Sequence, residues 1–233
     1  HITDEIKRDM LYLGKTKKYD FVITEIGGTV GDIEGQPFLE AIRQLKWDLG
    51  KNAVCIHLTY VPYLAAAGEL KTKPTQHSVK ELQSLGIQPD ILVLRAEHEL
   101  GAGLRRKIAA FCNVSPEAVV QSLDMPTIYE VPLRMQEQGL DATILRKLDM
   151  PVGDTPGLGP WRSFLDRRHK ATEIINIGLV GKYDLQDAYK SILEALSQAG
   201  TYNDRKVKCH FINSEKITPE NVSQMLEGMD GYV

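Results

Sequence analysis

The feature that most constrains this fold is an alternation of short apolar segments with amphipathic segments along the chain. The apolar segments predict strands, and the segments between them have the 3.6-residue periodicity of helices. A helix that joins two strands makes a right-handed crossover, so the strands should form a parallel sheet covered on both faces. The sequence therefore predicts an α/β fold. The expected strands are 19–26, 52–60, 90–94 and 119–123, and the expected helices are 3–13, 37–49, 75–85 and 104–111.

Residues at the helix ends support these boundaries. Thr3 is the expected N-cap of the first helix, and Gly86 is expected to end the third. Pro116 suits the first position of a further short helix. Residues 127–150 predict two more helices with no strand between them.

The composition changes at Pro151, where proline and glycine become frequent. Such a stretch does not sustain a helix, so a linker is expected over 151–173. We therefore expect a first domain over 1–150 and the beginning of a second α/β domain over 174–233. The second domain should contain a strand at 174–180, a turn at 181–183, a helix at 187–199 with Asp187 as its N-cap, and a strand at 206–212.

Charge and composition exclude several functional classes. The chain carries 28 basic and 31 acidic residues, a net charge of −3, which argues against a nucleic-acid-binding protein. No apolar run is long enough to span a membrane, and no signal peptide stands at the start. The three cysteines, Cys55, Cys112 and Cys209, show no CxxC spacing, so a disulfide framework or zinc site is not expected. Cys55 and Cys209 fit small buried hydrophobic positions, and the compartment should be reducing and cytoplasmic.

The two ends of the chain suggest a piece of a longer protein. The chain begins at His1 rather than methionine, and 229–233 resemble a turn followed by the first residues of a strand. We therefore expect residues on either side that complete both domains.

An acidic, glycine-rich segment follows the first expected strand. The sequence EIGGTVGDIE at 25–34 places one carboxylate at the strand end and two more in the loop. The carboxyl ends of parallel strands form the ligand crevice of open α/β sheets. Mg²⁺ takes one or two carboxylates and leaves its other positions to water and phosphate. The segment predicts a magnesium or phosphate site, against the alternative of a turn with solvated acids.

A second candidate is the sequence KTKPTQ at 71–76, directly before a predicted helix. Two lysines, two threonine hydroxyls and the free N–H groups of a first helical turn can bind an anion. An exposed loop in which Thr75 only caps the helix explains the same residues equally well. A weaker basic cluster, Arg105-Arg106-Lys107, fits either a phosphate contact or a solvated helix face.

Other motifs are incomplete. The sequence around Gly181-Lys182 is not a P-loop, because the earlier glycine and the following serine or threonine are missing, and the chain holds no complete GxxxxGK[ST]. His57 is expected in or near the core, and His77 beside the lysine-containing loop. No nucleophile elbow or Cys–His pair is present.

Taken together, the segments 25–34, 37–44, 68–82 and 86–90 closely resemble the CTP synthase family. The residues around Val180-Gly181-Lys182 and 187–191 resemble the start of that family's glutaminase domain. The resemblance implies a P-loop-like synthase domain, similar to dethiobiotin synthetase, followed by a class I glutamine amidotransferase domain. It implies a ligase that forms a C–N bond, using ATP, Mg²⁺ and ammonia from glutamine to convert UTP to CTP. GTP would activate, CTP would inhibit, and the enzyme would be a homotetramer with sites between subunits.

The resemblance also assigns roles to residues. Glu25 would bind Mg²⁺ beside the ATP phosphates. The family's P-loop lysine and glutaminase triad would lie outside the chain, so this chain alone should complete neither reaction, and Cys209 is not the glutaminase nucleophile. By matching motifs, the UTP- or CTP-binding residues would be Asp32, Ile33, Glu34, Lys71, Thr72, Lys73, Pro74, Thr75, Gln76 and Lys107, and Leu123, Asp124 and Met125 would lie near the ATP base.

Two other interpretations remain open at this level. A different synthetase of the dethiobiotin or cobyric acid type would share the carboxylate at the strand end but not the KTKPTQ sequence. A non-catalytic module would bind nucleotide or partner subunits without turnover.

Overall fold

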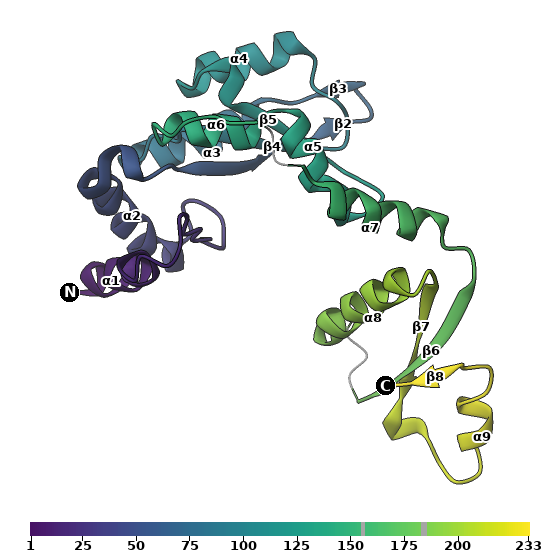
Figure 1. Ribbon diagram of the computed structural model, residues 1–233. Coiled ribbons are helices and arrows are strands. Elements are labelled where there is room, and N and C mark those ends of the chain that lie inside the picture. The colour runs from purple at the N-terminus through teal and green to yellow at the C-terminus, as the bar shows by residue number, and fades with distance from the viewer. Residues whose placement is uncertain (155–156, 183–185) are drawn as a thin grey trace. The chain divides into compact units, whose positions relative to one another are not determined.

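The structure is a computed structural model that describes residues 1–154, 157–182 and 186–233 (Figure 1). The chain divides into two compact units, His1–Thr155 and Pro156–Val233. No helix among the described residues is long and apolar enough to cross a membrane.

The first unit is built on the parallel sheet that the sequence predicts. Its strands are β1 (Ile56–Tyr60), β4 (Ile91–Ala96) and β5 (Val119–Leu123), in the order β1-β4-β5. Leu58 of β1 pairs with Val93 of β4, which pairs in turn with Val120 of β5. Because both pairings are parallel, the carboxyl ends of all three strands lie at one edge of the sheet.

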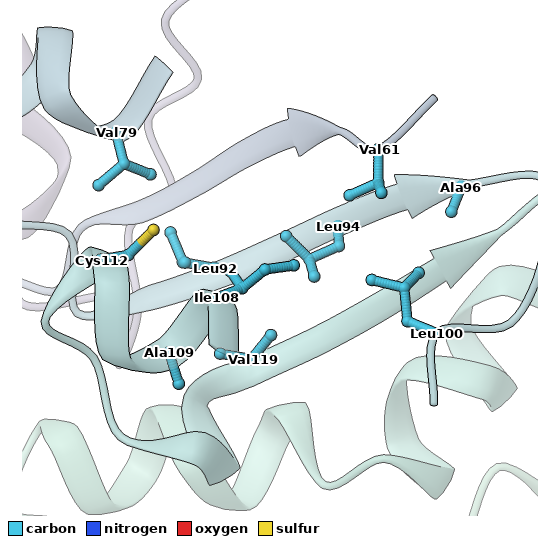
Figure 2. Packing of buried hydrophobic residues seen from close by; sticks show 10 residues of the cluster. All are labelled: Val61, Val79, Leu92, Leu94, Ala96, Leu100, Ile108, Ala109, Cys112 and Val119. Atoms are coloured by element: carbon cyan, nitrogen blue, oxygen red, sulfur yellow. The ribbon is translucent and has the colours of Figure 1, made fainter. Parts of the chain in front are cut away.

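Helices α3 (Lys73–Ser84) and α4 (Ala102–Cys112) cover one face of this sheet. Figure 2 shows the apolar core that forms between them, in which β4 side chains meet Val79 of α3 and Ile108 of α4. Each residue of this core is buried. The members are Val61, Val79, Leu92, Leu94, Ala96, Leu100, Ile108, Ala109, Cys112 and Val119.

The remaining elements of the first unit surround this core. Helix α1 (Ile2–Lys15) packs on α2 (Gln36–Leu49), and α5 (Val131–Glu137) packs on β5 and on α6 (Leu140–Lys147). Helix α1 begins at Ile2 with His1 at the N-cap, one residue before the predicted helix start. The short elements are η1 (Ile33–Gly35), η2 (Gly50–Asn52), the antiparallel pair β2 (Tyr63–Leu64) and β3 (Glu69–Leu70), η3 (Pro116–Ala118) and η4 (Ile128–Glu130).

The strand predicted at 19–26 is wrong for this structure. The segment runs without regular secondary structure, and its apolar side chains are exposed, Ile23 to 93%. Periodicity and β-propensity report a tendency to extend, but a strand forms only beside a hydrogen-bonded neighbour. Among the described residues, no segment pairs with 19–26.

The second unit has its own parallel sheet. Strand β6 (Ile174–Gly181) lies between β7 (Lys206–Asn213) and β8 (Gly231–Tyr232). Helix α8 (Lys190–Tyr202) packs on β7 and on α7 (Gly159–Lys170). The short elements are η5 (Gln186–Tyr189), η6 (Ser214–Lys216) and α9 (Val222–Met225).

Two details of the second unit differ from the sequence prediction. Helix α7 occupies most of the segment expected as a linker, and Pro160 stands in its first turn, where the missing N–H has no helical partner to lose. The helix expected from Asp187 begins at Lys190 with Tyr189 at its N-cap, because 186–189 form a 3₁₀ turn. Of the predicted turn at 181–183, Gly181 ends β6 and Tyr183 lies outside the described residues.

The cysteines are free thiols, as the sequence predicts. Cys112 is buried in the core, and burial raises the pKa of its thiol to about 11. Cys55 precedes β1 and Cys209 lies within β7, both half-buried, and burial raises the pKa of each thiol. A thiol with a raised pKa is a poor nucleophile at neutral pH.

Candidate functional site

Three groups of predicted site residues lie on the first unit. They are the acidic loop 25–34, the lysine loop 71–76 and the segment 123–125 at the end of β5. The lysine loop and the segment at the end of β5 lie at the carboxyl ends of the sheet, where ligands of α/β folds bind. The acidic loop lies elsewhere.

The acidic loop packs against the far end of α3. Val30 contacts the apolar cluster that contains Leu82 and Ile87, and a side chain at Gly31 would meet Glu81 at 3.5 Å. Glu81 stands about 12 Å along the helix axis from Lys73, at 1.5 Å per residue. The structure therefore does not join the acidic loop to the lysine loop within one site.

Local backbone geometry shapes the acidic loop. Gly28 and Gly31 have φ of +84° and +105°, which side chains other than glycine rarely adopt. Asp32 accepts a hydrogen bond from the backbone N–H of Thr29 at 3.0 Å, so its carboxylate holds the turn. Ile33 is exposed at the start of η1. Of the predicted nucleotide contacts 32–34, Asp32 has a structural partner and Glu34 faces a cavity.

That cavity has a volume of about 340 Å³. Glu25 and Glu34 line it together with Gly27, Gly35 and the ring of Phe38. Two carboxylates are the protein ligand set that Mg²⁺ commonly uses when phosphate and water complete its octahedron. Among the described residues, no three His, Cys, Asp or Glu side chains gather into a fuller metal cage. The donor set thus fits a magnesium ion that keeps most of its ligands from substrate and solvent.

The lysine loop begins at the end of the β2–β3 hairpin. The backbone N–H of Lys71 donates to the carbonyl of Pro62 at 2.9 Å, and its ammonium pairs with Glu69. Thr72 is the N-cap residue of α3, and Pro74 stands in the first turn. Lys73 is exposed and makes no ion pair with any described residue. The loop therefore presents two cations at the positive end of a helix dipole, which suits a phosphate group.

The other side chains of this loop are buried. Gln76 donates to Thr72 Oγ1 at 3.1 Å, and both side chains are at most 7% exposed. Thr75 is fully buried, and its hydroxyl donates to the carbonyl of Tyr60 at 3.1 Å. Only Lys71, Lys73 and Pro74 of the six predicted residues offer side chains to a ligand in solution. Thr72, Thr75 and Gln76 hold the loop.

A polar group at the ends of β4 and β5 completes this edge of the sheet. Arg95 Nε lies 3.4 Å from Asp124 Oδ1, and the backbone N–H of Asp124 donates to Ala96 at 3.1 Å. Tyr60 donates to Glu97 at 3.1 Å, a bond that raises the pKa of the tyrosine. Leu123 and Met125, beside Asp124, are half-buried, and Asp124 is exposed.

Arg95, Tyr60 and Glu97 are site candidates that the sequence reasoning missed. Arg95 interrupts an apolar strand, and a charged residue at the end of a buried strand is the signal that would have pointed to it. The structure brings this group and the lysine loop to the same edge, since Thr75 bonds to the backbone of Tyr60.

The three residues of the basic cluster on α4 differ in exposure. Lys107 and Arg106 are exposed, and Lys107 contacts no acidic side chain among the described residues. Arg105 is half-buried, and its Nε has no hydrogen-bond partner within the described chain. No hydrogen bond or ion pair between described residues joins Lys107 to the lysine loop, so its predicted nucleotide contact stays a prediction.

The two histidines singled out from the sequence differ in environment. His57 is buried in β1 and hydrogen-bonds through Nε2 to Ser78 Oγ at 2.8 Å, as expected of a core residue. Burial lowers its pKa. His77 is exposed on α3 next to the lysine loop.

Comparison with known proteins gives a consistent result. Residues 1–150 match the family model described as "CTP synthase N-terminus". The chain is 76% identical to the CTP synthase of Bacteroides thetaiotaomicron, 62% to that of Porphyromonas gingivalis and 59% to that of Flavobacterium johnsoniae. Each of these alignments covers the whole of this chain. The chain spans about 44% of the length of the curated relatives it matches.

Proposed function

The chain belongs to the CTP synthase family, and from that membership we propose that it forms part of an enzyme that aminates UTP to CTP. The observation that carries the proposal is the lysine loop. Its two cationic side chains stand at a helix N-terminus, and its hydroxyls are held in place by buried hydrogen bonds. This is an arrangement for the phosphates of a nucleotide rather than a solvated surface loop.

The pyrimidine nucleotide, UTP as substrate or CTP as inhibitor, is assigned to the lysine loop. Lys71 and Lys73 would neutralise its phosphate oxygens, and the N–H groups of the first turn of α3 would donate to them. Asp32, Ile33, Glu34 and Lys107 belong to the same proposal. Because the acidic loop lies at the other end of α3, Asp32, Ile33 and Glu34 would reach the nucleotide of a neighbouring subunit. This fits a homotetramer with sites between subunits.

ATP is assigned to the end of the sheet formed by Leu123, Asp124 and Met125, together with Arg95. The half-buried Leu123 and Met125 offer an apolar surface to an adenine ring. The Arg95 guanidinium, oriented by Asp124, can stack on the ring face. The backbone N–H of Asp124 donates to the carbonyl of Ala96, which keeps the segment 123–125 beside the end of β4.

Glu25 would hold Mg²⁺ next to the ATP phosphates, and Glu34, which lines the same cavity, keeps its proposed role toward the pyrimidine nucleotide. The bound ion would neutralise negative charge on the phosphates during phosphoryl transfer. The γ-phosphoryl group of ATP passes to the uracil O4, and ADP leaves. Ammonia then attacks C4, the C4–O bond breaks and inorganic phosphate departs. Glutamine hydrolysis in the amidotransferase domain supplies the ammonia.

The wider roles are proposals of the same kind. GTP would activate ammonia release, CTP would inhibit, and the enzyme would act in cytoplasmic pyrimidine nucleotide synthesis. No nucleic-acid or membrane partner is proposed.

The test is turnover by the full-length protein. UTP, ATP and Mg²⁺ are supplied with ammonium or with glutamine, and CTP is quantified by chromatography. We expect CTP in both reactions and its loss in Glu25→Gln, whereas Glu5→Gln, an exposed carboxylate of α1, should keep full activity. Full-length protein that binds ATP but forms no CTP from either nitrogen source would overturn the proposal and favour another synthetase reaction.

A further inference from the structure

The strand β1 carries polar side chains where the rest of the core is apolar. Its residues alternate between exposed and buried, and the two buried ones are His57 and Thr59, each 8% exposed. The neighbouring positions of β4 on the same face are Leu92 and Leu94. Burial of polar groups costs free energy unless each finds a hydrogen-bond partner.

Both side chains find that partner on α3. His57 Nε2 lies 2.8 Å from Ser78 Oγ, and Thr59 Oγ1 donates to Thr75 Oγ1 at 3.4 Å. The Thr75 hydroxyl in turn donates a hydrogen bond to the carbonyl of Tyr60 at 3.1 Å. These hydrogen bonds therefore link His57, Thr59 and Tyr60 of β1 to Thr75 and Ser78 of α3.

The spacing of these contacts fixes the position of α3 along the strand. His57 and Thr59 are two residues apart on one face of β1, about 6.6 Å. Thr75 and Ser78 are three residues apart on one face of α3, about 4.5 Å. The pairs run in opposite order, 57 with 78 and 59 with 75, so α3 lies antiparallel to β1. Sliding or rotating the helix would break both contacts at once, whereas apolar side chains would tolerate such movement.

We propose that His57 and Thr59 are positioning residues: through Ser78 and Thr75 they fix the first turn of α3 and so place the lysine loop against the nucleotide phosphates. The inference rests on the proposed function for the identity of the ligand. The backbone N–H of Lys71 donates to Pro62, just after β1, so both ends of the lysine loop are hydrogen-bonded to the same end of this strand.

Stability alone does not account for these residues. A buried hydrogen-bonded pair is commonly replaceable by apolar side chains of similar volume without loss of stability. Thr59→Val removes the donor to Thr75, whose hydroxyl keeps its bond to Tyr60. His57→Leu leaves Ser78 free to bond to its own helix backbone. Neither substitution leaves a buried polar group without a hydrogen-bond partner, so a loss of function would not reflect a destabilised core.

The experiment uses the full-length protein with the single and combined His57→Leu and Thr59→Val substitutions. Thr201→Val is the matched control, since it also removes the hydroxyl of a buried threonine, one that donates to the carbonyl of Ser197 in the second unit. Thr59→Ser, which keeps the hydroxyl, is the conservative variant. The measurements are the dissociation constant and KM for UTP, KM for ATP, the melting temperature and hydrogen exchange of amides 71–78.

We expect the combined variant to raise KM and the dissociation constant for UTP by about 10- to 100-fold, as a small misplacement of binding groups does. KM for ATP should change less than about twofold. Thr59→Ser, which keeps the hydroxyl, should bind UTP as the wild type does. Amides 71–78 should exchange faster in the combined variant without nucleotide. The control should match wild type in all of these.

The outcomes separate the two ideas. If wild type does not bind UTP or make CTP, the proposed function is wrong, and the exchange of amides 71–78 still decides the positioning role. If wild type makes CTP but the combined variant keeps wild-type UTP affinity and exchange, His57 and Thr59 are not positioning residues. An equal rise in KM for UTP and for ATP, together with a lower melting temperature, would likewise overturn the inference, because it would show a general structural role.

Discussion

Replacing Lys73 should move stability and nucleotide affinity in opposite directions. Lys73 is the first residue of α3, exposed, with no acidic partner in the described chain. A cation at the positive end of a helix dipole is unfavourable by about 0.3–1 kcal/mol. Lys73→Ala should therefore stabilise the nucleotide-free protein, raising the melting temperature by about 1–4 °C for a unit of this size.

Nucleotide binding should respond with the opposite sign. A hydrogen bond to a charged group contributes about 1.5–3 kcal/mol. Its removal should raise the dissociation constant for UTP by about 10- to 150-fold. Lys71→Ala should have a smaller effect, because Lys71 already pairs with Glu69 and must give up that contact to bind phosphate.

The assay is isothermal titration of UTP into full-length protein, with melting curves recorded without nucleotide. The control is Lys80→Ala, an exposed lysine two turns further along the same helix. It should leave both quantities unchanged, because it lies beyond the first turn where the dipole acts. A Lys73→Ala variant with lower melting temperature, or with UTP affinity within twofold of wild type, would refute the electrostatic argument for the loop.

Further predictions concern the scaffold. In urea unfolding, Gly86→Ala should lower the free energy of unfolding by about 1–2 kcal/mol, because Gly86 has φ +82° and the new Cβ would lie 2.9 Å from Arg43 Cδ. Gly103→Ala, with open space around the new Cβ, should raise the free energy of unfolding by about 0.5 kcal/mol in the same experiment. Leu94→Ala, at a fully buried core position, should cost about 2–5 kcal/mol in that experiment, and a loss below 1 kcal/mol would contradict the core assignment. Burial lowers the pKa of His57, so below the ordinary pKa of 6.5 the unfolded chain binds a proton at this residue more readily than the folded chain does. The free energy of unfolding should therefore fall as the pH drops through that value. The fall should be smaller in His57→Leu, measured as the urea midpoint at several pH values.

The parallel sheet was predictable because its strands carry their own signal. The segments expected at 52–60 and 119–123 contain β1 and β5, and the segment expected at 90–94 covers β4 except for its last two residues. The prediction at 19–26 used the same signal and is wrong here, because pairing depends on a neighbour that the local sequence does not describe. Helix α7 was missed for a different reason. Pro160 and Gly159 suggest a break when taken as composition, but at a helix start proline is favourable.

The candidate site was predictable in its residue types and not in its side-chain environments. The lysine loop is visible in the sequence because cations precede a helix start. Nothing in the sequence shows that Thr75 and Gln76 are buried, since burial follows from how α3 lies on β1. Arg95 escaped notice because the expected strand ended one residue before it, and its partner Asp124 is 29 residues away in the chain.

The lysine loop contains two kinds of side chain with different roles. Lys73 is exposed and destabilises the helix that it begins, Lys71 is half-buried and pairs with Glu69, and the hydroxyls and amide are buried and hold the helix in place. Either set alone would be of little use for binding. Exposed lysines on a mobile turn would lose much of their gain to the entropy of ordering two long side chains. A well-anchored turn without cations would offer only N–H groups to a triphosphate. On the positioning role that we propose for the polar residues of β1, a fixed helix start holds Lys73 at the position where a bound phosphate would offset its unfavourable interaction with the helix dipole.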